Sequence, residues 1–64
     1  MKYSIRYSSN TGNPSLYRIT PEGKVEYFGW ITRRWEKSAC SVETVSRNEP
    51  VTEEEAKKQF HDAF

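Results

Sequence analysis

The stretch LYRITPEGKVEYFGW, from Leu16 to Trp30, decides the fold because it has the sequence of a β-hairpin with a definable register. Pro21 presets φ for the first central position of a type I turn. Gly23 supplies the left-handed residue that closes a three-residue loop. This turn predicts five strand pairs, which are Thr20 with Lys24, Ile19 with Val25, Arg18 with Glu26, Tyr17 with Tyr27 and Leu16 with Phe28.

The register sorts the hairpin side chains onto two faces, because successive strand residues point in opposite directions. The purely apolar and aromatic face is expected to be the core, and it holds Tyr17, Ile19, Val25, Tyr27 and Ile31. The opposite face carries charged residues and a distal apolar patch of Leu16, Phe28 and Trp30. That patch is either covered by another segment or exposed. Because one short helix covers only one face of a sheet, we predict that Phe28 and Trp30 are accessible or buried between two copies.

Three further segments are predicted to be strands with unequal support. Residues 2–8 alternate as a half-buried strand does. The second hairpin strand is expected to continue past a bend at Gly29 as far as Trp35. Residues 41–47 are rich enough in β-branched residues for a short fourth strand, although their alternation is poor.

A C-terminal helix is the best supported element. Thr52 is a good N-cap, and Glu55 completes a capping box with it. The apolar positions at i, i+4, i+7 and i+8 form one stripe, made of Ala56, Phe60, Ala63 and Phe64. The sequence therefore predicts an α+β fold, a small antiparallel meander of three or four strands with one C-terminal helix packed on one face.

Size and composition limit the function. A chain of 64 residues predicts a single domain, residues 1–64, with a thin core and no room for a deep substrate pocket. Cys40 and His61 are the only cysteine and histidine, so the chain has neither an intrachain disulfide nor the ligands of an ordinary zinc site. We predict no catalytic residue, metal, cofactor or small-molecule substrate. No signal peptide or membrane-spanning stretch is visible, which favours a cytoplasmic protein.

The segment WITRRWEK, residues 30–37, is the strongest candidate for binding. Tryptophan and arginine are the residue types most enriched at the energetic centres of protein interfaces. The same types stack on bases and pair with phosphates in single-stranded nucleic acid. Residues 1–37 also carry a net charge of +4 and residues 38–64 one of −3, although complementary ends of one domain explain this equally. The predicted binding residues are Leu16, Arg18, Phe28, Trp30, Arg33 and Arg34.

The sequence thus predicts a small non-enzymatic binding module that acts through protein–protein contact, as an inhibitor or accessory subunit, with homodimerisation as one form of that contact. The alternative is a small nucleic-acid-binding protein that uses a basic aromatic sheet face. No motif identifies a family, and the general organisation resembles that of short reading frames of bacteria and their phages. The identity of the partner is not encoded in any recognisable motif.

Overall fold

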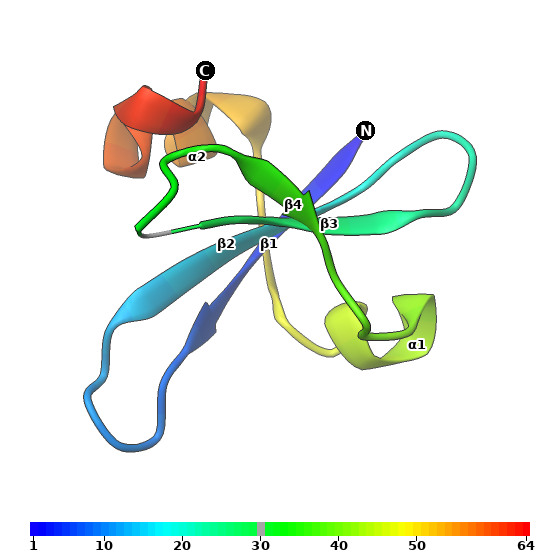
Figure 1. Cartoon of the computed structure of the whole chain (residues 1–64), viewed down its shortest axis with the longest axis horizontal. Coiled ribbons are helices and arrows are strands. Elements are labelled where there is room, and N and C mark those ends of the chain that lie inside the picture. Colours follow the sequence, from blue (N-terminus) through cyan, green and yellow to red (C-terminus); the bar gives the residue numbers. More distant parts are fainter. Residues whose placement is uncertain (30) are drawn as a thin grey trace.

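Among the described residues, an antiparallel sheet of five strands in the order β4-β3-β2-β1-β5 forms the centre of the molecule (Figure 1). The structure is a computed structural model that describes residues 1–29 and 31–64. The strands β1 to β4 follow one another as a meander, and β5 adds to the free side of β1, so the predicted α+β meander is confirmed. The elements are β1 (Lys2–Tyr7), β2 (Pro14–Ile19), β3 (Val25–Phe28), β4 (Trp35–Lys37), α1 (Val42–Val45), β5 (Glu49–Val51), α2 (Glu53–Gln59) and the 3-10 helix η1 (His61–Ala63).

The hairpin of β2 and β3 has the predicted turn and register. Ile19 pairs with Val25, Arg18 with Glu26 and Tyr17 with Tyr27. Gly23 has a φ of +83°, in the left-handed region that the three-residue loop requires. The Thr20 N–H donates to the Lys24 carbonyl at 2.8 Å, which closes the loop at the expected pair.

Two strand predictions are wrong for local reasons. The chain reverses after Phe28 instead of running on to Trp35, because Gly29 donates its N–H to the Arg34 carbonyl at 2.9 Å and accepts from the Arg33 N–H at 3.0 Å. Residues 41–47 contain the helix α1 and no strand, because the Ser41 hydroxyl accepts from the backbone N–H of Thr44 and caps a helical turn.

The C-terminal segment packs on the face that holds Leu16, so the predicted assignment of the core face is wrong. Leu16 and Ala56 have no exposed surface, and with Ile5 and Tyr3 they form the main buried cluster. Phe28, Trp35, Val51, Phe60 and Ala63 pack around that cluster.

Pairing across the whole sheet explains this choice of face. Directly opposed residues point to the same side of a sheet, so the pairs Ile5–Leu16 and Phe28–Trp35 add their side chains to one face. The hairpin alone makes the tyrosine face the more apolar of the two. With β1 and β4 included, the Leu16 face carries the larger apolar area and therefore takes the helix.

Residues 1–29 and 31–64 cover the opposite face only at one end. Val25 and Val45 are buried there, and Val45 of α1 lines a shallow hollow together with Ile19 and Ser4. Tyr17 and Tyr27, which are paired across β2 and β3, remain half-buried on this face.

The helix α2 begins as predicted and ends early. Both hydrogen bonds of the capping box are present, from the Glu55 N–H to Thr52 Oγ1 at 3.1 Å and from the Thr52 N–H to Glu55 Oε1 at 3.3 Å. Phe60 leaves the helical conformation, with φ −128° and ψ 55°, and the chain continues as η1. No helix in the described part of the chain is long and apolar enough to cross a membrane.

The left-handed Gly23 leads to a test of the hairpin. Gly23→Ala should lower the free energy of unfolding by about 1 kcal/mol, because the new Cβ meets the preceding backbone at positive φ. Urea denaturation measures the change. Glu22→Ala, next to it in the same exposed loop, is the control and should be nearly neutral. A Gly23→Ala variant as stable as the control would contradict the loop geometry.

Candidate functional site

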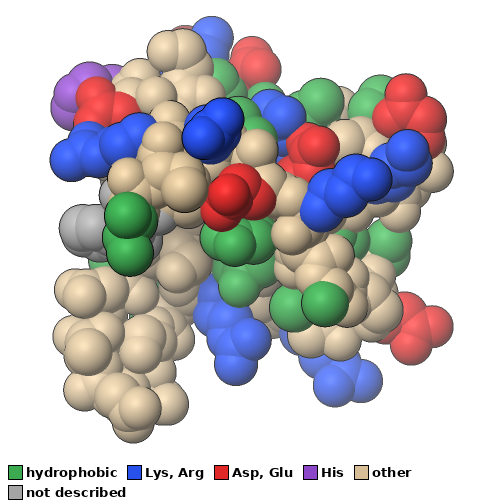
Figure 2. Space-filling view, in the orientation of Figure 1, with side chains coloured by type: hydrophobic (Ala, Val, Ile, Leu, Met, Phe, Trp, Pro, Cys, Tyr) green, Lys and Arg blue, Asp and Glu red, His purple; other side chains and the backbone are tan. Residues whose placement is uncertain are grey.

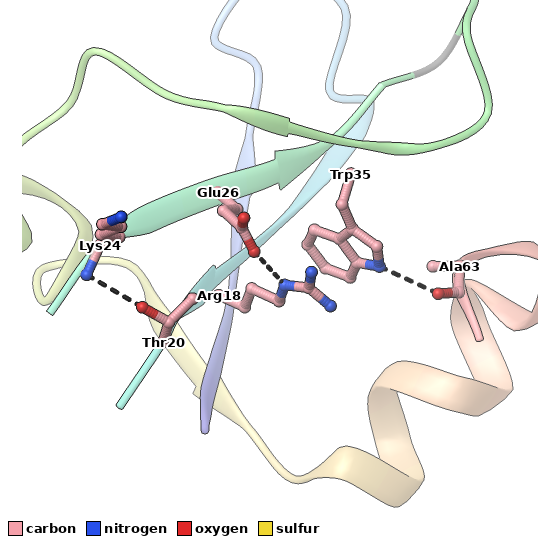
Figure 3. Close-up of polar contacts among 6 residues, drawn as sticks. All are labelled: Arg18, Thr20, Lys24, Glu26, Trp35 and Ala63. Carbon is pink, nitrogen blue, oxygen red and sulfur yellow. Dashed lines mark hydrogen bonds and ion pairs between the residues drawn. The ribbon is translucent and has the colours of Figure 1, made fainter. Parts of the chain in front are cut away.

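Arg18, predicted to bind a partner, is held inside the structure by Trp35. The Arg18 guanidinium lies 3.9 Å from the centre of the Trp35 ring, and its Nε donates to Glu26 Oε1 at 2.7 Å. The Trp35 indole N–H donates to the Ala63 carbonyl at 3.0 Å, so it ties β4 to η1 (Figure 3). Arg18 therefore contributes to the internal packing, and only about a fifth of its side chain (21%) is exposed.

Aromatic rings surround Trp35 on the other sides. Phe28 meets it edge-on with ring centres 5.8 Å apart, and Phe64 lies at 6.4 Å. Tyr3 contacts Phe64 at 5.5 Å. Burial, and then the nearby charge of Glu53, raise the pKa of Tyr3 above its ordinary value of 10.0. The cluster anchors the C-terminus to the sheet.

The six residues predicted to bind do not form one surface. Leu16 is completely buried, so its predicted contact with a partner is incompatible with this fold. Phe28 is half-buried, whereas Arg33 and Arg34 are exposed beyond the end of β3. Trp30 lies outside the described residues.

A hollow opens beside Arg33, at the end of the molecule where η1 approaches the chain reversal between β3 and β4. Its volume is about 300 Å³. Phe28 and Phe60 are its aromatic lining residues, and both pack against the core cluster at its back. The polar residues of the lining are Asn13, Arg33, Gln59, His61 and Asp62. The site is thus an apolar floor with a polar rim.

An ion pair crosses the rim of this hollow. The guanidinium of Arg33 donates to Asp62 Oδ2, and the other carboxylate oxygen lies 3.2 Å from His61 Nε2. Arg33 and Asp62 are well exposed, with side-chain accessibilities of 66% and 46%. Surface pairs of this kind contribute little to stability, because water screens them and two mobile side chains must be ordered.

Ile31 is the site residue that the sequence analysis missed. It was expected on the core face, but the chain reversal after Gly29 leaves it 96% exposed. The signal that could have placed it is Gly29 itself, because a glycine inside a strand pattern often marks a bulge, a sharp bend or a close approach. In the structure, a Cβ at Gly29 would crowd the side chain of Thr32. We call Ile31, Arg33 and the hollow floored by Phe28 and Phe60 the turn surface.

A second candidate surface is the uncovered face of the sheet. The rings of Tyr17 and Tyr27 lie 6.3 Å apart at 45°. Arg6 shares this face, since it pairs with Ser15 two residues before Tyr17, and it is exposed. The Tyr27 hydroxyl donates to Glu36 Oε2 at 3.2 Å, and this bond to a carboxylate raises the pKa of Tyr27 above 10.0.

Charges of both signs are interspersed on the face of the molecule that Figure 2 shows. Figure 2 shows Lys and Arg side chains alternating with Asp and Glu side chains on the face viewed, with no broad area of one sign. The formal net charge is +1. This distribution differs from the continuous basic stripe that is typical of nucleic-acid-binding domains.

No group of three potential metal ligands occurs among the described residues. Within the same part of the chain, the lining of the hollow contains no serine, threonine or cysteine that His61 could activate as a nucleophile. No protein-family model matches the chain, and comparisons with curated proteins and with solved structures gave no significant match.

The bond between Tyr27 and Glu36 predicts a pH effect. The raised pKa means that the folded state favours the neutral phenol, so its contribution to stability is complete below pH 10.0 and is lost as the pH rises through the folded-state pKa. In Glu36→Gln, tyrosine ionisation followed by ultraviolet absorbance should begin at lower pH than in the wild type. Glu22→Gln, in the exposed hairpin loop, is the control and should leave the titration unchanged. Identical titrations of Glu36→Gln and the wild type would rule the effect out.

Proposed function

We propose that this protein is a small non-enzymatic binding module that acts through protein–protein contact, with the turn surface as its contact site. One observation carries the proposal. Ile31 is 96% exposed, and it lies two residues before Arg33, which lines an open hollow together with Phe28 and Phe60. A partner that covered both the Ile31 side chain and the aromatic lining of the hollow would remove apolar surface from water, which favours association.

The turn surface also has the composition of a protein interface. Apolar groups lie at its centre and charged groups lie around them, as they do in protein complexes. Arg33 stands on the rim, and arginine is one of the three residue types most frequent at energetic hot spots. Arg34, exposed next to it, extends the polar rim.

The size of the hollow supports a binding role over a catalytic one. Its volume of about 300 Å³ lies at the lower limit of small-molecule sites, which enclose most of their ligand. A hollow of this size accepts one side chain of a protein partner. A chain that acts in this way works by occupying a partner's surface, as an inhibitor or accessory subunit does. The single cysteine and the absence of a disulfide framework favour the cytoplasm as its place of action.

Nucleic-acid binding is the alternative, and the tyrosine face is the observation that favours it. Tyr17 and Tyr27 present neighbouring rings on an uncovered sheet, and Arg6 adds a positive charge beside them. Bases stack on such rings, and arginine pairs with phosphates. The formal net charge of only +1 counts against this alternative, since affinity for nucleic acid comes mainly from neutralised phosphates.

The test compares variants of the two surfaces in one affinity capture from the host. Ile31→Ser and Arg33→Glu should each weaken capture of a specific partner protein at least tenfold. Val42→Ser is the matched control, because Val42 is an exposed aliphatic residue on α1, outside the turn surface. Tyr17→Ala should not affect capture.

Two results would overturn the proposal. In the first, Val42→Ser weakens capture of the partner protein as much as Ile31→Ser does. The other is saturable binding of single-stranded oligonucleotides that falls steeply with salt and is lost in Tyr17→Ala, which would establish the alternative.

A further inference from the structure

We infer that the occupant of the hollow is Ile31 of a second copy of this chain, in a dimer with two-fold symmetry. The inference rests on the proposed function, since it names the partner of the same turn surface. A two-fold interface uses one patch twice, so that patch must carry both a projecting group and the cavity that receives it. The turn surface carries both.

The shapes of the two parts correspond. Ile31 projects into solvent with 96% of its surface exposed, and the hollow offers about 300 Å³ between Phe28 and Phe60. Arg33 connects the projecting side chain with the hollow, because it lines the hollow and lies two residues after Ile31. Burial of one isoleucine in each of two hollows removes apolar surface from water on both copies.

Backbone hydrogen bonds join Gly29 to the residues that follow Ile31. Gly29 and Arg34 are joined through their backbones at 2.9 Å. Arg33 has a φ of +57°, a left-handed conformation that is unfavourable for a residue with a side chain. A loop closed by backbone hydrogen bonds loses less conformational entropy on docking than an open loop does.

The charges on the rim are self-complementary. Arg33 and Asp62 have opposite signs and stand on the same rim. In the proposed dimer, Arg33 and Asp62 exchange their pairing within one copy for the equivalent pairing across the two-fold axis, and the reverse pair forms at the same time. A formal net charge of +1 leaves little repulsion between copies.

The edges of the sheet do not offer a competing route to a dimer. The edge strands β4 and β5 contain three residues each. Pro50, in the middle of β5, has no N–H to donate, and Lys37 of β4 is exposed with its charge. Short, charged or proline-containing edges resist pairing with another chain.

Sedimentation equilibrium of the full chain, from about 10 μM to about 1 mM, tests the inference over the range of weak dissociation constants. The wild-type protein should shift from monomer to dimer as its concentration rises. Ile31→Ser should weaken the dimer at least tenfold, and Val42→Ser should leave it unchanged. Circular dichroism confirms that each variant is folded.

A mixing experiment tests the symmetry. Arg33→Asp places two carboxylates on one rim, and Asp62→Arg places two guanidinium groups there, so each variant alone should remain monomeric. An equimolar mixture of the two should dimerise, because every contact across the axis then joins opposite charges. If Arg33 and Asp62 act only within one chain, the mixture should remain as monomeric as each variant alone.

The possible results separate this inference from the proposed function. A wild-type monomer at all concentrations overturns the inference, and so does a dimer that Ile31→Ser or mixing does not affect. If the monomer nevertheless captures a different protein in a manner that requires Ile31, the proposed function stands without the inference. If Ile31→Ser affects neither the dimer nor the capture of another protein, both the inference and the proposed function are wrong.

Discussion

The contacts of one indole ring organise this fold. Trp35 lies against the Arg18 guanidinium at 3.9 Å and donates its N–H to the Ala63 carbonyl at 3.0 Å. Through Arg18 and Glu26 it is coupled to the β2–β3 hairpin, and through Ala63 to the C-terminus. Few aliphatic side chains are available in 64 residues, so one large aromatic ring connects elements that a bigger core would hold by packing alone.

This arrangement determines which groups remain for binding. Arg18 and Phe28 belong to the internal packing around Trp35, and Arg33 is drawn toward η1 by Asp62. The polar rim and the apolar floor of the turn surface therefore depend on the same C-terminal segment that closes the core. A protein that lost the docking of η1 would lose its hollow as well.

Local signals in the sequence predicted local structure, and long-range pairing decided the rest. The turn at Gly23 and the capping box at Thr52 each depend on residues within a few positions, and both are confirmed. The core face depends on which strands join the hairpin. Ile5 and Trp35 add to the Leu16 side only through pairing with β2 and β3, which no short window of sequence contains. Of the candidate site, Arg33 and Phe28 are also among the residues that the sequence predicts to bind, and their role stays a prediction. The sequence places Ile31 on the core face, because a glycine alone does not distinguish a bend within a strand from the chain reversal that follows Gly29.

The coupling between Arg18 and Trp35 is the most direct measure of this account. In a double-mutant cycle with Arg18→Gln and Trp35→Leu, the two losses of unfolding free energy should fall short of additivity by about 0.5–2 kcal/mol, because each change removes the same stacked pair. The cycle of Arg18→Gln with Ile31→Ser is the control and should be additive. Additive losses in the first cycle, within about 0.3 kcal/mol, would show that the stacked pair is not what joins the hairpin to β4.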